Sequence, residues 1–439
     1  MPGEVRMFNP AIETMPREQM RELQLERLKA MVKYCYERVP MYTRRMNEMG
    51  VRPEDIQELK DVSKLPFTVK DDVRDNYPYG LLAVPLKQIV RIHASSGTTG
   101  KPITAGYTKA DLDNWAEMVA RLCVAGGASD EDIAQISFGY GLFTGALGLH
   151  YGLEKLGATV VPISSGNTER QIMMMHDLGV TTLIATPAYA MYMAETAERM
   201  GMIGKLKLKY GILGAEGSTE EMRRELERRW GGITVTENYG LTEIMGPGVA
   251  GDCKYKNGMH INEDFFLCEI VNPETGEPLP DGEYGELVIT NLLKEGQPML
   301  RYRTHDITRI VTEYCPCGRT SRRIEKIRGR SDDMLIVRGV NLFPSQVEAA
   351  LLGVNGIGPH YEIVLTRHNY MDKVQVKVEL IDESLLESYG ELENLRSQIK
   401  ANIRKICQLD MEITLVSPNT LKRFEGKARR VTDLRNKND

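Results

Sequence analysis

The chain has 439 residues, of which 42% are hydrophobic and 27% charged, and its formal net charge is −5. This balance is typical of a globular protein of several domains, and it gives no indication of binding to nucleic acid or to an anionic membrane. No apolar run approaches the ~20 residues that cross a bilayer. The seven cysteines are unevenly spread and predict no disulfide framework. We therefore expect a cytoplasmic protein without a nucleic-acid or membrane partner.

The first motif is a loop rich in serine, threonine and glycine at residues 94–102. Residues 11–50 before it carry helical spacing, and the short apolar run 88–92 predicts a strand that ends in the loop. Two glycines free the backbone to turn its N–H groups inward, and four hydroxyls add donors, so the loop suits a polyphosphate. Its spacing is not that of a Walker loop. Composition alone favours an ordinary surface loop.

Apolar runs then alternate with amphipathic segments up to residue 236. Strands separated by helices of this length predict parallel βαβ units. The expected strands are 134–137, 159–162, 181–185, 206–213 and 234–236, and the expected helices are 108–122, 142–156, 169–178, 189–200 and 219–230.

The pattern changes near residue 260, where short strands are joined by Pro/Gly turns. Residues 265–271, 285–291 and 306–312 predict an antiparallel sheet or a β-barrel-like subdomain. A boundary follows at Gly329–Asp333, and the remaining residues form a small α+β module of ordinary domain size. We therefore expect an α/β fold with a large N-terminal domain, 1–329, and a small C-terminal domain, 330–439.

Two polar clusters follow predicted strands. Asn238–Glu243 comes after the strand at 234–236, a position where open α/β sheets bind ligands. There Tyr239 can stack on a base, Thr242 can donate to a phosphate, and Glu243 can hold Mg²⁺. Gly214–Gly217 ends another strand, and its small residues leave room for a flat ring. Taken singly, each cluster is equally consistent with an ordinary polar turn.

These motifs in their order resemble the adenylate-forming superfamily of acyl-CoA ligases. The series is Ser95–Lys101, Gly214–Glu216, Tyr239–Glu243, Tyr302–Asp306, Gly329–Asp333 and Gly426-Lys427. Longer runs, His93–Pro102 and Gly329–Asn341 among them, are similar to the phenylacetate-CoA ligase family within it. The resemblance extends over nearly the whole chain.

The resemblance implies a role for each matched residue. The loop would grip the β- and γ-phosphates of ATP through Ser95, Ser96, Gly97, Thr98, Thr99, Gly100 and Lys101. Ala215, Glu216, Asn238 and Tyr239 would frame the adenine, with Gly240 beside them. Thr242 would touch the α-phosphate, Glu243 would bind Mg²⁺, and Asp306 would hold the ribose with Arg330 near it. Asp332 would be the hinge between the two domains, and Lys427 would reach into the site as the catalytic cation.

The implied reaction activates a carboxylic acid. Its carboxylate attacks the α-phosphorus of ATP, and the acyl adenylate then passes its acyl group to the thiol of coenzyme A. Phe138, Tyr140 and Gly141 can line an apolar slot, with Ala215 and Gly217 as its other wall, and the resemblance favours an aromatic acid and a homodimer. Two alternatives stay open: an adenylating enzyme that loads a carrier protein or another thiol, and a nucleotide-binding protein that has lost turnover.

A second constellation consists of Cys253, His260, Cys315 and Cys317. Three thiols and an imidazole fit a closed tetrahedral Zn²⁺ site of structural type. The two close cysteines have C-x-C spacing, which is less common in zinc sites than C-x-x-C. Buried cysteines without a metal are the alternative.

Overall fold

The computed structural model describes residues 6–95, 102–331, 335–337, 340–368, 371–424 and 428–435. The contacts divide the chain into two units. The first unit comprises Met1–Ala185, Gly204–Ala215 and Gly232–Ile327, and the second comprises Thr186–Ile203, Glu216–Gly231 and Arg328–Asp439. Among the helices of the described residues, none is long and apolar enough to cross a membrane.

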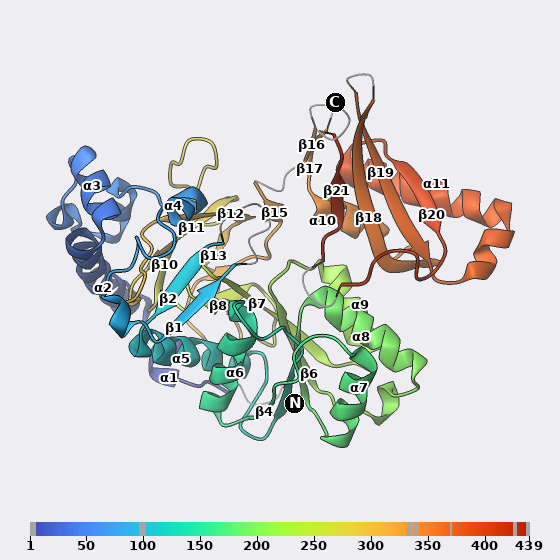
Figure 1. Cartoon of the computed structure of the whole chain (residues 1–439), viewed down its shortest axis with the longest axis horizontal. Coiled ribbons are helices and arrows are strands. Elements are labelled where there is room, and N and C mark those ends of the chain that lie inside the picture. Colours follow the sequence, from blue (N-terminus) through green and yellow to red (C-terminus); the bar gives the residue numbers. More distant parts are fainter. Residues whose placement is uncertain are drawn as a thin grey trace. The chain divides into compact units, whose positions relative to one another are not determined.

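A nine-stranded mixed sheet is the centre of the first unit, and its parallel half confirms the predicted βαβ pattern. Neighbouring parallel strands run in the order β7-β6-β5-β3-β4. Their bounds are β3 Ile133–Ile136, β4 Thr159–Val161, β5 Thr182–Ala185, β6 Tyr210–Gly214 and β7 Thr234–Leu241. The antiparallel half continues from β7 through β8 Gly246–Asp252, β9 Met259–Ile261, β14 Arg323–Ile324 and β13 Ile310–Val311. Figure 1 shows β6, β7 and β8 side by side.

Three helices of the first unit lie next to strands of this sheet in the chain: α5 Lys109–Ala125 leads into β3, α6 Thr144–Leu156 connects β3 to β4, and α7 Thr168–Asp177 connects β4 to β5. Thr108 caps the N-terminus of α5, and its Oγ1 accepts a hydrogen bond from the backbone N–H of Asp111 at 3.1 Å. The Asp111 carboxylate accepts one in return from the Thr108 N–H at 3.0 Å, which completes a capping box. Helices α5 and α6 both pack against β8.

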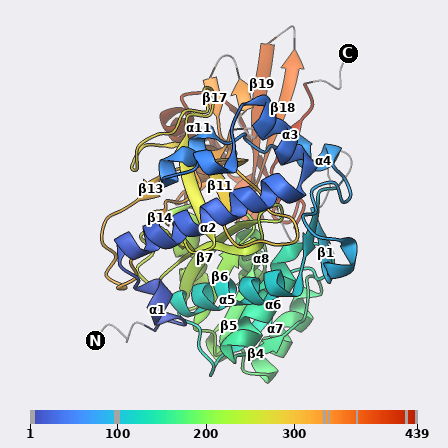
Figure 2. The ribbon, with the colours of Figure 1, turned by 90° about the vertical axis from the view of Figure 1, so that its left-hand side faces the viewer.

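The N-terminal helices are α1 Pro10–Glu13, α2 Arg17–Arg38, α3 Pro40–Glu48 and α4 Lys70–Asp75. Helix α2 runs across the first unit (Figure 2) and is fixed to the chain before β10 by one buried glutamine. The Gln24 side-chain amide donates to the carbonyls of Glu263 and Phe266 at 2.8 and 3.1 Å.

The strand predicted at 88–92 begins later than expected. Leu86–Gln88 forms a 3-10 turn, and strand β1 Arg91–Ala94 pairs with β2 Thr104–Tyr107 in an antiparallel hairpin. Pairing with β2 determines where the strand starts, since the first paired residue is Arg91, opposite Tyr107. The Ser/Thr/Gly-rich loop therefore joins the two strands of a hairpin.

Of the two structures predicted after residue 260, an antiparallel sheet or a β-barrel-like subdomain, the antiparallel sheet is confirmed, and within the described residues it does not close into a barrel. Strands β10 Phe266–Val271, β11 Gly285–Asn291 and β12 Tyr302–Thr308 pair antiparallel in that order. A sheet closes into a barrel when its first and last strands pair. Within the described residues β10 is an edge strand whose strand partner is β11, so the sheet is open.

The second unit contains the α+β module expected at the C-terminus. A four-stranded sheet in the order β20-β19-β18-β21 packs with two helices. The elements are β18 Ile357–His368, β19 Met371–Leu380, β20 Glu412–Val416, β21 Val431–Asp433, α10 Pro344–Leu351 and α11 Tyr389–Cys407. The same unit holds α8 Pro187–Arg199, α9 Glu220–Arg229, β15 Gly329–Arg330 and the hairpin β16 Leu335–Val337 with β17 Val340–Leu342.

Candidate nucleotide site and candidate metal centre

The ends of β6 and β7 bring two of the predicted nucleotide-binding segments together. Gly214 pairs with Asn238, whose side-chain amide donates to the Leu213 carbonyl at 2.9 Å. A Cβ at position 214 would lie only 2.6 Å from the Asn238 amide nitrogen, so the close approach of the two strands requires glycine there. Ala215 follows with φ of 70° and is exposed. This edge of the sheet presents a small residue next to a fixed amide.

The expected loop at Asn238–Leu241 is part of strand β7. This segment was predicted to follow the strand, but β7 extends to Leu241 because it pairs antiparallel with β8. The chain then turns tightly, and a Cβ on Gly240 would lie 1.8 Å from the Gly246 carbonyl oxygen. Strand pairing with β8 therefore holds both the tyrosine and the glycine of the motif, with a shift of register between Tyr239 and Gly240.

Tyr239 and Asp306 lie in contact, although they are 67 residues apart. The Tyr239 hydroxyl donates to Asp306 Oδ2 at 2.5 Å. Burial, and then the neighbouring Asp306 carboxylate, raise the pKa of Tyr239 well above its usual value. Asp306 lies within β12 and is 5% exposed. The base-stacking and ribose-binding candidates thus form one hydrogen-bonded pair.

Thr242 and Glu243 lie in the turn between β7 and β8. Thr242 is buried, and its hydroxyl lies 3.2 Å from that of Thr144 at the start of α6. Glu243 is half-buried, and its carboxylate has no hydrogen bond or ion pair to another residue in the described part of the chain. A half-buried carboxylate without a protein partner fits a hard divalent cation such as Mg²⁺.

Glu216 belongs to the second unit, and backbone amides of that unit hold its side chain. One carboxylate oxygen accepts from the Ala188 N–H at the start of α8 at 2.6 Å, and the other accepts from the Ala428 N–H at 2.8 Å. Gly217 is exposed, and Arg330 is half-buried in β15.

Most of the phosphate-loop candidates lie outside the described residues. These are Ser96, Gly97, Thr98, Thr99, Gly100 and Lys101, together with the hinge candidate Asp332 and the catalytic candidate Lys427. Ser95 is described and fixes the base of the loop. Its N–H donates to the Ile103 carbonyl at 2.9 Å, and its hydroxyl accepts from the Ile103 N–H at 3.2 Å.

Three of the acyl-pocket candidates, Phe138, Tyr140 and Gly141, lie between β3 and α6, whereas Ala215 and Gly217 follow β6. Phe138 is buried with its ring centroid 6.2 Å from that of Phe143, and a Cβ on Gly141 would meet nothing within 4 Å. The Tyr140 hydroxyl hydrogen-bonds with His150 Nδ1 at 3.1 Å. Burial raises the pKa of Tyr140. A buried aromatic ring followed by an exposed glycine with room around it is compatible with an apolar ligand.

His150 in α6 hydrogen-bonds on both sides of its ring. Its Nε2 lies 2.9 Å from a carboxylate oxygen of Glu154, so Tyr140, His150 and Glu154 form one chain of hydrogen bonds. The sequence carried a signal for this contact, since residues four apart share one face of a helix.

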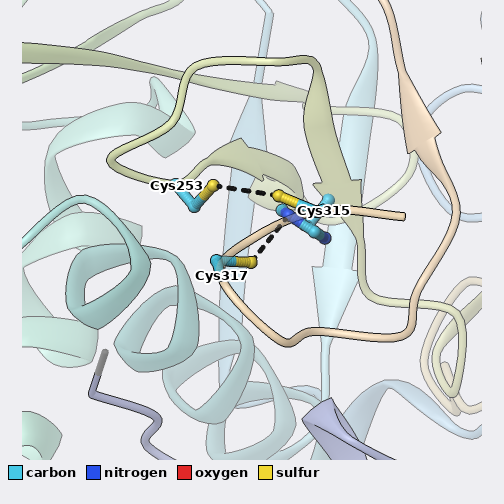
Figure 3. Close-up of side chains that lie close together, drawn as sticks. Cys253, Cys315 and Cys317 are labelled. Atoms are coloured by element: carbon cyan, nitrogen blue, oxygen red, sulfur yellow. Dashed lines mark hydrogen bonds between the residues drawn. The ribbon is translucent and has the colours of Figure 1, made fainter. Parts of the chain in front are cut away.

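The four candidate metal ligands converge on one buried point. Cys253 follows β8, His260 lies in β9, and Cys315 and Cys317 follow β13. Figure 3 shows the three cysteines close together. Cys253 Sγ lies 3.6 Å from Cys315 Sγ, and Cys317 Sγ lies 3.3 Å from His260 Nε2. All four ligand atoms lie within 4.8 Å of one another. In a tetrahedral zinc site, ligands at about 2.0–2.3 Å from the ion lie roughly 3.5–3.8 Å apart, so this cluster fits zinc.

Neighbouring groups orient His260 and favour the thiolate form of Cys317, as metal binding requires. His260 Nδ1 hydrogen-bonds with Ser321 Oγ at 3.1 Å, which leaves Nε2 facing Cys317. A hydrogen bond from Cys253, and then one from His260, lower the pKa of the Cys317 thiol. A metal binds the thiolate form of cysteine. The four other cysteines, Cys35, Cys123, Cys268 and Cys407, are buried, as expected for core residues.

Two family models match most of the chain. The model described as AMP-binding enzyme matches residues 27–293, and the model described as AMP-binding enzyme C-terminal domain matches residues 339–435. Phenylacetate-coenzyme A ligases of Thermus thermophilus and Escherichia coli are each 47% identical to this chain. The alignments cover 98% and 97% of this chain and 100% and 97% of those proteins.

Solved structures show the same fold. The crystal structure of a 2-hydroxyisobutyryl-CoA ligase in complex with 2-HIB-AMP has a TM-score of 0.91 and 28% sequence identity. It covers 97% of this chain and 91% of that protein. An anthranilate CoA ligase in complex with anthranoyl-AMP matches at a TM-score of 0.57 and 17% identity, covering 77% and 65% of the two chains.

Proposed function

Because this chain belongs to the AMP-binding enzyme family, we propose that it is an ATP-dependent ligase that joins an aromatic carboxylic acid, phenylacetate or a similar acid, to coenzyme A. The products are the acyl-CoA, AMP and pyrophosphate. The observation that carries the proposal is the contact between Tyr239 and Asp306, because it assembles candidates for the base and the ribose of one nucleotide next to Thr242 and Glu243.

The proposed first step is attack of the substrate carboxylate on the α-phosphorus of ATP. Negative charge builds up on the phosphate oxygens in this step, so cations and N–H or O–H donors at fixed positions lower the barrier. The buried Thr242 hydroxyl is suited to the α-phosphate, and the Glu243 carboxylate is suited to magnesium. Magnesium bound there would neutralise phosphate charge. Ser95–Lys101 and Lys427 would complete the phosphate site.

The proposed second step is attack of the coenzyme A thiol on the acyl adenylate. We place the domain boundary between residues 329 and 330 and the hinge at Asp332. Rotation of the smaller domain after adenylation would withdraw Lys427 and admit the thiol, which is a common gating arrangement. Phe138, Tyr140 and Gly141, with Ala215 and Gly217, would hold the aromatic acid.

We also propose that Cys253, His260, Cys315 and Cys317 hold one structural zinc ion. The support is their convergence and burial. The cluster leaves no ligand position for substrate, because four protein ligands close a tetrahedral site. The homodimer and the cytoplasmic location remain predictions from the sequence.

Two measurements on the intact protein test the reaction. Exchange of labelled pyrophosphate into ATP, measured with aromatic, arylacetic and aliphatic acids, reports the first step. Detection of acyl-CoA by mass spectrometry reports the second. We expect both signals with an arylacetic acid. Exchange without acyl-CoA would favour an enzyme that loads a carrier protein, and no exchange with any acid would favour a nucleotide-binding protein without turnover.

Asp306→Asn is expected to weaken ATP binding selectively. The substitution removes the negative charge of the side chain that accepts a hydrogen bond from the Tyr239 hydroxyl. In our proposal the same carboxylate also accepts hydrogen bonds from the ribose hydroxyls. Hydrogen bonds to charged groups contribute about 1.5–3 kcal/mol, so we expect the KM for ATP to rise about tenfold or more while the KM for the acid changes little. Initial-rate kinetics with each substrate varied measure this. Asp113→Asn, an exposed change on α5, is the control, and an equal rise of both KM values would contradict the ribose role.

A further inference from the structure

A buried lysine, Lys294, has no part in the function proposed above. It lies in the connection that follows β11 and is 1% exposed. Its ammonium donates to the Ile244 carbonyl at 2.7 Å and lies 4.7 Å from the centroid of the Tyr107 ring. Among the described residues, no carboxylate lies within ion-pair distance of this ammonium. The charge is thus directed at a backbone carbonyl and an aromatic face.

Burial of an ammonium without a carboxylate partner is unfavourable. Burial lowers the pKa of Lys294 to about 8, and the more distant carboxylates of Asp111 and Glu243 oppose this shift. Lys294 therefore still carries its charge near neutral pH. Perturbed ionisable groups of this kind are concentrated at functional sites.

The backbone that carries Lys294 is itself held in place. The buried Asp111 carboxylate accepts hydrogen bonds from the N–H groups of Glu295 at 2.7 Å and Gly296 at 2.8 Å. These are the two residues directly after Lys294. The lysine therefore extends from a fixed point of the chain.

The carbonyl that Lys294 binds follows Glu243 directly in the sequence. Three further buried donors hold the same segment. The Asn291 amide donates to the same Ile244 carbonyl at 3.4 Å, the Tyr107 hydroxyl donates to the Met245 carbonyl at 3.0 Å, and the Trp115 indole donates to the Pro247 carbonyl at 2.7 Å. Of these four donors, Lys294 carries the charge and makes the shorter of the two contacts with the carbonyl nearest to Glu243. The geometry fixes the backbone from which the Glu243 carboxylate projects.

We propose that Lys294 is a positioning residue for Glu243, and that its ammonium fixes the Ile244 carbonyl so that the Glu243 carboxylate is presented to magnesium. This inference rests on the proposed function, in which Glu243 is the magnesium ligand. It adds a residue that acts on the metal without touching it. Partners of this type orient metal ligands in many proteins.

The test uses two readouts. The first is the free Mg²⁺ concentration that gives half-maximal pyrophosphate exchange, and the second, without turnover, is the dissociation constant of Mn²⁺ as a probe for Mg²⁺, measured by electron paramagnetic resonance with ATP and no acid. For Lys294→Met, which keeps most of the length of the side chain and removes its charge, we expect the Mg²⁺ concentration and the Mn²⁺ dissociation constant each to rise about tenfold. In the double variant Lys294→Met/Glu243→Gln, the lysine change is expected to add little to the effect of Glu243→Gln, because both act through one carboxylate. Lys294→Gln is the second variant if the methionine variant does not fold, and it is expected to raise the magnesium requirement as well.

The matched control is Gln24→Leu, which also removes a buried side-chain donor to backbone carbonyls but lies at α2. It is expected to lower the thermal unfolding temperature without changing the magnesium requirement. If Glu243→Gln raises the requirement and neither lysine variant does, the inference on Lys294 is wrong while the proposed role of Glu243 stands. If Glu243→Gln leaves the requirement unchanged, both are wrong.

Discussion

Lys427→Ala is expected to abolish most of the adenylation activity while sparing the second half-reaction. Removing one group that stabilises transition-state charge costs about 10²- to 10³-fold in rate. Charge accumulates on the phosphates during adenylation, and transfer of the acyl group from a supplied acyl adenylate to coenzyme A needs no such cation. Pyrophosphate exchange measures the first half-reaction, and acyl-CoA formation from synthetic acyl adenylate measures the second.

Lys422→Ala is the matched control for this experiment. Lys422 is an exposed lysine of the same C-terminal segment, with its ammonium 5.7 Å from the centroid of the Phe424 ring. A general effect of positive charge in this segment would lower exchange in both variants. Equal losses of Lys427→Ala in the two half-reactions would contradict a role confined to adenylation.

Loss of one cysteine from the candidate metal centre is expected to destabilise the first unit strongly. Cys317→Ser removes a thiolate ligand from a buried cluster whose other three members stay in place. Loss of a structural metal belongs to the changes that cost about 4 kcal/mol or more. At about 2 °C per kcal/mol for a large domain, the thermal unfolding temperature should fall by about 8 °C or more. Elemental analysis should find about one zinc per chain in the unchanged protein and well below one in the variant.

Cys268→Ala separates the metal from the general effect of changing a buried cysteine. Cys268 is 4% exposed in β10, and burial raises its pKa to about 12, as expected for a core thiol. This variant should lose some stability through the small cavity that it leaves but keep its zinc. If the unchanged protein contains far less than one zinc per chain, the four residues form a metal-free core cluster.

Local pattern and tertiary pairing contributed differently to the fold. The βαβ order was predictable from the spacing of apolar residues. Helices and strands bury one face with different periods along the chain, and the sequence contains segments with each period. The end of β7 was not predictable. Residues 238–241 and their partners in β8, Gly246–Asp252, are rich in glycine and polar side chains, which are rare in strands. Their pairing with each other makes them strands, and a local pattern does not contain the partner.

For the site, the sequence alone determined the motifs, their order and the chemistry for which each is suited. The type of a residue determines whether its side chain can bind a phosphate, a ribose or a metal. The order of the motifs along the chain identifies the superfamily. The tertiary structure alone decided which groups meet. It brings Tyr239 to Asp306, and Cys253 and His260 to Cys315 and Cys317. It also places the Lys294 ammonium on the carbonyl after Glu243. Such contacts join strands and loops far apart in the chain, so they depend on how the whole sheet is paired and on no local pattern of residues.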